Sequence, residues 1–308
     1  MIMEIFSSMG LNAWLREAEL LNEHKAIIIA CLIALLFLIL ILIGKRLYRL
    51  KNKPLHKGVA PGCDQHIGSR KEQQDAFGFS ELSNEAFIEH GGAVAVVADG
   101  MGGLMGGREA SQRSVQSFLS DYVRKNETVS IINQLYASIN EANRKVVTWA
   151  EETGLKGKTG TTLAAAVVHD SRLYWASAGD SRIYLIRDNQ VFQVTYDHTY
   201  GRKLEEMAER GEISREEAEN HPARNSLTSF LGLESLEEID LSDTPISLQP
   251  NDMILLCSDG LYHSVTEEEM VNASVLDAQE AAEELIRLAL QKQLPYQDNL
   301  TAVILKIS

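Results

Sequence analysis

Short apolar runs separated by tight connections constrain the fold of this chain more than any other feature. Runs typical of buried β-strands recur at residues 93–98, 162–168, 173–176, 183–186, 253–257 and 300–307. The connections between the second, third and fourth runs are too short for crossover helices, so these strands are predicted to be antiparallel. A doubly wound parallel sheet is therefore disfavoured.

Helical patterns lie between and around these runs. Apolar residues three or four positions apart predict helices at about 107–123, 129–150, 200–210 and 278–291. Strands cluster in the middle of the chain, with helices before and after them. This order favours a layered α+β domain.

The segment 196–232 is different, because it is rich in charge and poor in β-type residues. Arg210-Gly211 predicts the end of a helix, and Ser214 with Glu217 three residues later forms a capping-box pattern. We interpret the segment as a small helical insertion on the sheet scaffold. Such insertions often cover an active site, and an inert surface excursion is the alternative.

A long apolar run precedes the predicted domain. Residues 26–43 are uncharged and almost wholly aliphatic, and Gly44 extends the run. At about 1.5 Å per residue, a helix of this length nearly crosses a hydrocarbon core of about 30 Å. A buried helix rarely stays apolar around its whole circumference, and no cleavage site typical of a signal peptide follows the run. The sequence therefore predicts a transmembrane helix at 26–44.

The flanking charges predict the orientation of this helix. Directly after it comes a series of bases with no acid among them: Lys45, Arg46, Arg49, Lys51, Lys53 and Lys57. Residues 1–25 contain only Arg16 and Lys25 as bases. By the positive-inside rule, the tail 1–25 lies outside the cell, 45–58 is a basic juxtamembrane linker, and the domain 59–308 lies in the cytoplasm. We expect a single-pass protein of the cell membrane.

Charge and cysteine content exclude several functional classes. The formal net charge of −14 argues against a nucleic-acid binder, because phosphate backbones need a basic surface. Cys31, Cys63 and Cys257 are far apart and form no redox or metal-ligand pair. A disulfide framework is not expected, which fits a reducing compartment.

Aspartates recur where predicted strands meet turns. The acids in this position are Asp99, Asp180, Asp259 and Asp298, and Asp75 follows Arg70 by five residues. Asp-Gly is also a common turn signal, so each acid alone is readily explained as part of a turn. As a set they are harder to dismiss, because strand ends in one layered domain converge on an edge.

Acids gathered at such an edge repel one another unless cations intervene. Mg²⁺ and Mn²⁺ prefer carboxylate, carbonyl and water oxygens. Two such ions about 4 Å apart that share one carboxylate can activate a water and stabilise a phosphoryl transition state. The 8 histidines show no zinc-like spacing with cysteine. The sequence therefore predicts a metal-dependent hydrolase of phosphate esters.

The motifs around these acids resemble a known family. The stretches are 68–77 (GSRKEQQDAF), 97–103 (VADGMGG), 160–162 (GTT), 178–184 (AGDSRIY), 257–261 (CSDGL) and 298–301 (DNLT). In this order they are similar to the bacterial form of the metal-dependent protein phosphatases (PPM, or protein phosphatase 2C), and they cover about residues 60–308. The resemblance implies a serine/threonine phosphatase with a four-layer αββα sandwich of two antiparallel sheets flanked by helices.

The resemblance also implies a metal centre with Mn²⁺ or Mg²⁺, two ions and a third. Asp99 would bridge two ions, with the Gly100 carbonyl on the second ion. Asp259 and Asp298 would complete the shell of the first ion, and Asp75 would act largely through water. In the implied mechanism, water activated by the two metals attacks phosphorus in line.

Further roles follow from the same resemblance. Asp180, together with Asp259, would contribute to the third metal site. Arg70 would receive the substrate phosphate, which suits the fork geometry of guanidinium. The insertion at 196–232 corresponds to the family's flap, with Asp197-His198 at its start and 225–228 near its end.

Three positions depart from the family pattern. Gln73 and Gln74 stand where relatives have Asn and Glu, and the neutral Gln74 is expected to weaken the second metal. Leu104 replaces a histidine that follows the glycine pair in many relatives. Met101 stands where eukaryotic members have a proposed general acid, so the sequence assigns no proton donor.

Other functional classes are less well supported. The glycines after residue 100 fail the dinucleotide-binding pattern at Met105, and residues 157–159 fail the P-loop pattern at Glu152. A catalytically weak or inactive binding module is the main alternative, with Gln74 as its best argument, although no metal aspartate is lost. The resemblance implies phosphoserine and phosphothreonine proteins as partners, among them a membrane serine/threonine kinase and its targets.

Overall fold

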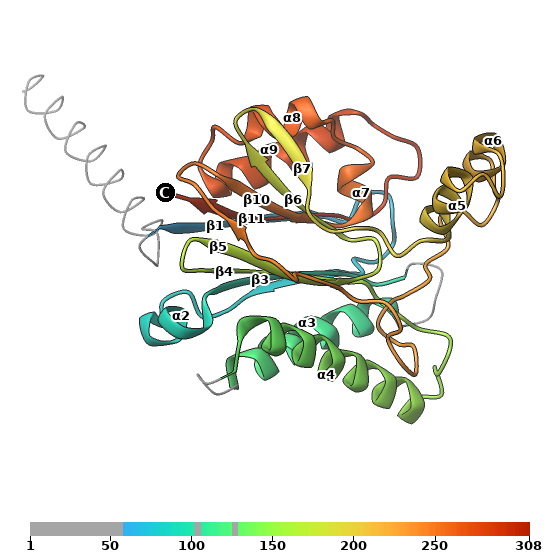
Figure 1. Ribbon diagram of the computed structural model, residues 1–308, viewed down its shortest axis with the longest axis horizontal. Coiled ribbons are helices and arrows are strands. Elements are labelled where there is room, and N and C mark those ends of the chain that lie inside the picture. The colour runs from blue at the N-terminus through green and yellow to red at the C-terminus, as the bar shows by residue number, and fades with distance from the viewer. Residues whose placement is uncertain (1–57, 102–105, 125–128) are drawn as a thin grey trace, which may run out of the picture. The chain divides into compact units, whose positions relative to one another are not determined.

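Two antiparallel sheets lie face to face at the centre of the domain, and helices cover their outer faces (Figure 1). The computed structural model describes residues 58–101, 106–124 and 129–308. All of these residues belong to one compact unit. The predicted four-layer αββα arrangement is confirmed.

The first sheet has the strand order β1-β11-β10-β6-β7. These strands are β1 (Val59–His66), β6 (Arg182–Arg187), β7 (Gln190–Gln193), β10 (Met253–Cys257) and β11 (Leu300–Ile307). Helices α8 (Glu267–Ala273) and α9 (Ala278–Gln291) pack on its outer face, and the short α7 (Asp259–Tyr262) follows β10 (Figure 1). Strands far apart in the sequence therefore form this layer.

The second sheet has the order β2-β3-β4-β5-β8, and β9 also pairs with β5. These strands are β2 (Asp75–Phe79), β3 (Ala93–Asp99), β4 (Leu163–His169), β5 (Arg172–Ala178), β8 (Asp240–Leu241) and β9 (Ile246–Ser247). Helices α3 (Gly107–Arg124) and α4 (Ile131–Glu152) cover its outer face, and α2 (Glu85–Gly91) precedes β3 (Figure 1).

The strands β3, β4 and β10 are almost wholly apolar because both of their faces are buried. In β3, Ala95 and Val97 point into the core between the sheets, whereas Val94 and Val96 pack under α3 and α4. Such two-sided burial produces continuous apolar runs instead of alternation. The continuous apolar runs therefore predict that these strands lie inside the sandwich, covered on both faces.

The sequence did not predict which sheet contains β6. The strands β4 and β5 are antiparallel neighbours as expected, but β6 pairs with β10 and β7 in the other sheet and not with β5. The connection at 179–181 therefore crosses from one sheet to the other. Gly179 has a φ of +108°, and a Cβ there would lie 2.6 Å from Thr162 Cγ2, so this crossing requires glycine.

The insertion at 196–232 contains the two predicted helical turns. Helix α5 (Tyr200–Glu209) ends at Arg210, and α6 (Arg215–Glu219) begins with the capping box of Ser214 and Glu217. In Figure 1 both helices lie to one side of the sandwich, near the end where α7 begins. We call residues 196–232 the flap.

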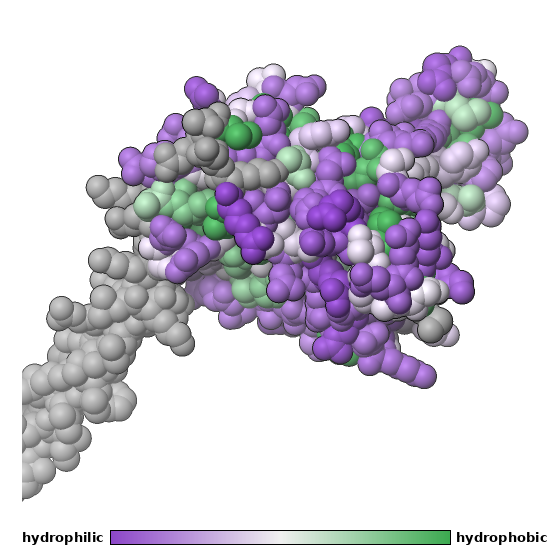
Figure 2. Space-filling model, turned by 90° about the horizontal axis from the view of Figure 1, so that it is seen from below, coloured by the Kyte–Doolittle hydropathy of each residue, from purple (hydrophilic) through white to green (hydrophobic). Residues whose placement is uncertain are grey.

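The predicted membrane segment lies outside the described residues. This applies to the tail 1–25, the helix 26–44 and nearly all of the linker 45–58. In the part of the chain that is described, no helix is long and apolar enough to cross a membrane. The face of the domain shown in Figure 2 is mostly hydrophilic, with hydrophobic residues scattered over it.

Candidate active site

The predicted aspartates meet at one end of the sandwich. Asp99 ends β3, and Asp75 begins β2 directly opposite it in the antiparallel register. Asp259 begins α7 after β10, Asp298 precedes β11, and Asp180 lies in the connection between the sheets. We call this set the acidic edge.

Asp75 is the most buried member, with 4% of its surface exposed. Ser258 Oγ and Thr301 Oγ1 each donate a hydrogen bond of 2.7 Å to its Oδ2, whereas its Oδ1 is buried without a partner. Burial raises the pKa of Asp75 to about 6, although the two hydroxyl donors oppose the change. The unpartnered oxygen faces an environment that disfavours negative charge.

Repulsion among the carboxylates shows that they share one electrostatic site. Burial raises the pKa of Asp99 well above its ordinary value, and its four acidic neighbours at the edge raise it further. Burial and the charge of Asp298 raise the pKa of Asp259, whose Oδ1 is also buried without a partner. Burial, followed by the charge of Asp259, raises the pKa of Asp180 to about 7.

These features fit the chemistry of a divalent-cation site. Negative charge in low dielectric is costly unless it is paired, and hard cations prefer carboxylate oxygens. Within residues 58–101, 106–124 and 129–308, no group of three or more His, Cys, Asp or Glu side chains is placed so that it could hold a metal ion. The acidic edge therefore supplies mutually repelling donors and two orphaned oxygens, but not a closed ligand shell.

Arg70 lies at the rim of the acidic edge. Its Nη2 contacts Asp298 Oδ2 at 2.6 Å, and 46% of the side chain is exposed. The turn before Arg70 packs against the segment that contains Asp298, because Ser69 N donates to Gln297 O at 2.8 Å. Gly68 has a φ of +62°, and a Cβ there would lie 2.1 Å from Asp298 O. The turn therefore delivers a solvent-accessible guanidinium to the carboxylates.

Gln74 is held through its backbone. Its carbonyl accepts from Gly100 N at 3.1 Å and from Ser111 Oγ at 2.5 Å, and its N–H donates to Asn299 Oδ1 at 2.8 Å. Its side-chain amide donates to Glu72 Oε2 at 3.3 Å. The neutral amide of Gln74 is therefore directed to Glu72, and its effect on the second metal stays a prediction. Gly100 forms an isolated bridge with Thr161, whereas Leu104 lies outside the described residues.

Several residues without a predicted role support the site. Ser258 and Thr301 both lie inside the recognised motifs, but only the cross-sheet geometry shows that they donate to the same oxygen of Asp75. Asn299 Nδ2 donates to the carbonyls of Ile67 and Glu72, so it ties the turn that carries Arg70 to β11. Their only sequence signal was proximity to an aspartate.

A cavity of about 570 Å³ lies between the acidic edge and the flap. Asp180, Asp259 and Tyr262 line one side of it. Arg202 and Arg224 belong to the flap side, and both form ion pairs with flap glutamates. The position of the flap therefore sets the space beside two of the candidate metal ligands.

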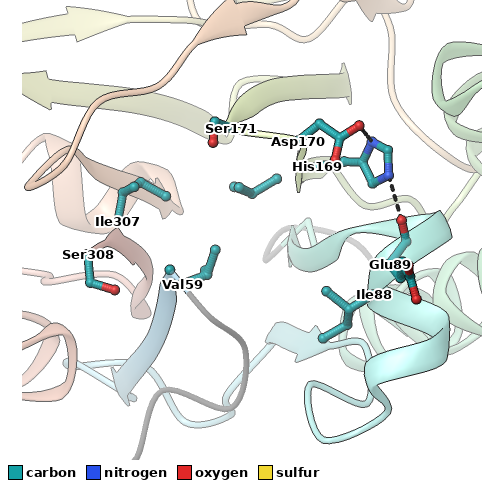
Figure 3. Close-up of a pocket in the computed structure, with 10 residues that line it drawn as sticks. Val59, Ile88, Glu89, His169, Asp170, Ser171, Ile307 and Ser308 are labelled. Carbon is teal, nitrogen blue, oxygen red and sulfur yellow. Dashed lines mark hydrogen bonds and ion pairs between the residues drawn. The ribbon is translucent and has the colours of Figure 1, made fainter.

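A cavity of about 650 Å³ lies elsewhere, lined by the start of β1, the ends of β4 and β11 and part of α2 (Figure 3). Val59, Ile88, Val168 and Ile307 form its apolar wall, and His169 Nε2 contacts Glu89 O at 3.0 Å. None of the predicted site residues lines it. This cavity is therefore separate from the acidic edge.

Comparisons with known proteins point to one family. The family model described as protein phosphatase 2C matches residues 63–300. Serine/threonine phosphatase stp of Listeria welshimeri is 37% identical over 222 residues, which cover 69% of this chain and 84% of that protein. The crystal structure of Mycobacterium tuberculosis serine/threonine phosphatase PstP/Ppp aligns with a TM-score of 0.66 at 29% identity, covering 82% of this chain and 99% of that one. The catalytic domain of PstP in complex with two manganese ions aligns with a TM-score of 0.63 at 28% identity, over 81% and 98% of the two chains.

Proposed function

Because the chain belongs to the protein phosphatase 2C (PPM) family of metal-dependent serine/threonine protein phosphatases, we propose that it hydrolyses phosphoserine and phosphothreonine of proteins at the acidic edge. One observation carries this assignment. Carboxylates from separate segments of the chain meet at one end of the sandwich and raise one another's pKa values. A site of this kind gains stability and function together when divalent cations bind.

The metal assignment divides the acidic edge by role. Asp99 would contribute to holding both of two Mn²⁺ or Mg²⁺ ions, and the Gly100 carbonyl would contribute to the second. Asp259 and Asp298 would hold the first ion. The Oδ1 atoms of Asp75 and Asp259 are buried without a hydrogen-bond partner, which supports the assignment of these two aspartates to the metal centre. When bound, the two ions would supply an activated water and neutralise charge on the phosphoryl group.

A third ion is a separate proposal. Asp180 and Asp259 line the cavity beside the flap, and each raises the pKa of an acidic neighbour in this cluster. These two carboxylates would hold the additional ion. Of these two aspartates, Asp259 has a buried oxygen without a partner, and Asp180 has none.

Arg70 is the proposed phosphate-binding residue. It is the guanidinium that contacts the acidic edge at Asp298, and nearly half of its side chain is exposed. A phosphate dianion offers a bidentate acceptor that matches the guanidinium fork. Substrate binding would therefore replace the Asp298 carboxylate by phosphoryl oxygens as the partner of Arg70, and the phosphorus would lie beside Asp298.

We further propose that a single helix at 26–44 anchors the phosphatase in the cell membrane. The supporting evidence is the uncharged apolar run and the bases of the linker 45–58 that follow it. The tail 1–25 would lie outside the cell and the domain 59–308 in the cytoplasm. Phosphoproteins near the membrane, such as a serine/threonine kinase and its targets, are the partners that this arrangement favours.

A phosphopeptide assay tests the activity. The full chain in detergent should release phosphate from a phosphothreonine peptide with Mn²⁺ or Mg²⁺, and excess chelator should abolish the release. Asp99→Asn should be inactive, whereas Asp188→Asn should retain activity, because Asp188 lies in the tight turn between β6 and β7 with a φ of +50°. Metal-independent turnover, or equal loss in both variants, would contradict the proposal.

A further inference from the structure

The flap is attached to the sandwich at two places beside the acidic edge. Its returning segment is attached by backbone hydrogen bonds, because Leu231 and Thr161 exchange bonds of 2.9 and 3.0 Å. Its outgoing segment is attached through His198 N, which donates to Gly179 O at 3.0 Å, and through the side chain of Asp197. The returning segment is also attached where Gly232 N donates to Asn143 Oδ1 at 2.8 Å. In the outgoing segment, the Asp197 side chain is attached through an ion pair with Arg182.

That contact is made by Arg182 at the start of β6. Its Nε donates to Asp197 Oδ1 at 3.0 Å, and its Nη2 donates to Asp197 Oδ2 at 2.7 Å. Its Nη1 donates to Tyr184 Oη at 2.9 Å, and the guanidinium lies 3.7 Å from the ring centroid of Tyr262. The Arg182 and Asp197 side chains are only 24% and 19% exposed. All three guanidinium nitrogens therefore donate hydrogen bonds, and one face of the group lies on Tyr262.

The partners of Arg182 connect three parts of the site. Asp197 belongs to the flap. Tyr262 is the last residue of α7, and Asp259 is its first. Arg182 itself follows Asp180 by two residues. All of these residues line the cavity between the flap and the acidic edge. A shift of Arg182 would therefore change the width of that cavity.

We propose that Arg182 is a positioning residue for protein substrates, which holds the outgoing segment of the flap on α7 and so fixes the cavity where residues flanking the phosphorylated side chain bind. This inference rests on the proposed function for its substrate class. Lysine cannot replace the arginine, because an ammonium group offers neither a planar fork to Asp197 nor a flat face to Tyr262. A small aryl phosphate occupies only the phosphate position and does not require the flap.

The chain provides a matched control on the same strand. Arg187, at the other end of β6, donates from Nε and Nη2 to Asp252 at 2.8 and 2.5 Å. That pair is also bidentate and partly buried, but it lies outside the cavity beside the flap. Arg187→Gln therefore removes a comparable ion pair without touching the flap.

The test compares the full chain with its Arg182→Gln, Arg182→Lys and Arg187→Gln variants in detergent with Mn²⁺. For Arg182→Gln and Arg182→Lys, KM for a phosphothreonine peptide should rise about tenfold, the factor produced by about 1.4 kcal/mol. Their kcat and KM for p-nitrophenyl phosphate should stay within about twofold of the parent. Arg187→Gln should leave KM for both substrates unchanged.

Limited trypsin digestion gives a readout that does not depend on catalysis. The flap contains Arg202, Lys203 and Arg210, and in the Arg182 variants cleavage after these residues should accelerate relative to Arg187→Gln. Full rescue by lysine, equal changes of KM for both substrates, or unchanged cleavage of the flap would overturn the positioning role. Inactivity of the unmodified chain would instead refute the proposed function, and the digestion would still test the contact.

Discussion

Replacing Asp75 by asparagine should stabilise the metal-free protein at pH 8 while weakening its response to divalent cations. An asparagine carbonyl can accept both hydrogen bonds that Asp75 Oδ2 receives from Ser258 and Thr301. Its amide group would then occupy the position of Oδ1, which has no partner and lies in the field of Asp259 and Asp298. The substitution therefore keeps the packing and replaces a repelled oxygen by a donor.

The magnitude follows from the pKa of Asp75, which rises from 3.8 to about 6 on folding, mainly through burial. The folded state therefore binds the proton more tightly than the unfolded state. The resulting stability is fully present below the ordinary pKa of aspartate and is lost as the pH rises through about 6. At about 1.4 kcal/mol per pH unit, the loss is about 3 kcal/mol, an upper value because neighbouring carboxyl groups share the proton.

Thermal unfolding of the full chain in detergent with excess EDTA measures this effect. The emission of Trp149 and Trp175 reports on the domain. At about 2–4 °C per kcal/mol, Asp75→Asn should raise Tm by up to about 10 °C at pH 8, and the difference should vanish near pH 4. Excess Mn²⁺ should raise Tm of the parent chain more than that of the variant. A variant that is less stable than the parent at pH 8 in EDTA would refute the reasoning.

Four substitutions test other residues of the site. Asp99→Asn or Asp259→Asn should abolish Mn²⁺-dependent hydrolysis of a phosphothreonine peptide with unchanged circular dichroism, and retained activity in either would contradict its assignment. Arg70→Ala should raise KM for the peptide about tenfold or more, because a charge-assisted phosphate contact is lost; a fall in kcat alone would mean that Arg70 has another role. Gln74→Glu should lower the Mn²⁺ concentration needed for half-maximal activity, and an unchanged metal titration would show that the neutral amide does not weaken the second ion.

The strands that sequence analysis predicted well are those buried on both faces. Strands β3, β4 and β10 read as continuous apolar runs because one face packs between the sheets and the other under helices. The strands β1 and β2 were missed. They lie at sheet edges and contain glycine, polar or half-buried positions, so their pattern is not that of a buried strand.

The position of β6 could not be predicted from local pattern. A short connection indicates that two strands run in opposite directions, but it does not say whether they share a sheet. At 179–181 the chain changes sheets, and the evidence for this is tertiary: Gly179 packs on Thr162, and β6 pairs with β10 far along the chain. The role of Arg182 could not be predicted for the same reason, because its partners Asp197 and Tyr262 come from later segments of the chain.

Antiparallel pairing explains why scattered aspartates could be predicted to meet. Where one strand ends at the acidic edge, its antiparallel neighbour begins there, as Asp99 and Asp75 do on β3 and β2. The same holds in the other sheet, where β10 leads into Asp259 and Asp298 leads into β11. The acids thus mark successive passages of the chain through one edge, beyond the three apolar core clusters. Their repulsion is confined to that edge, and this is why a neutral residue there should stabilise the fold at the expense of metal binding.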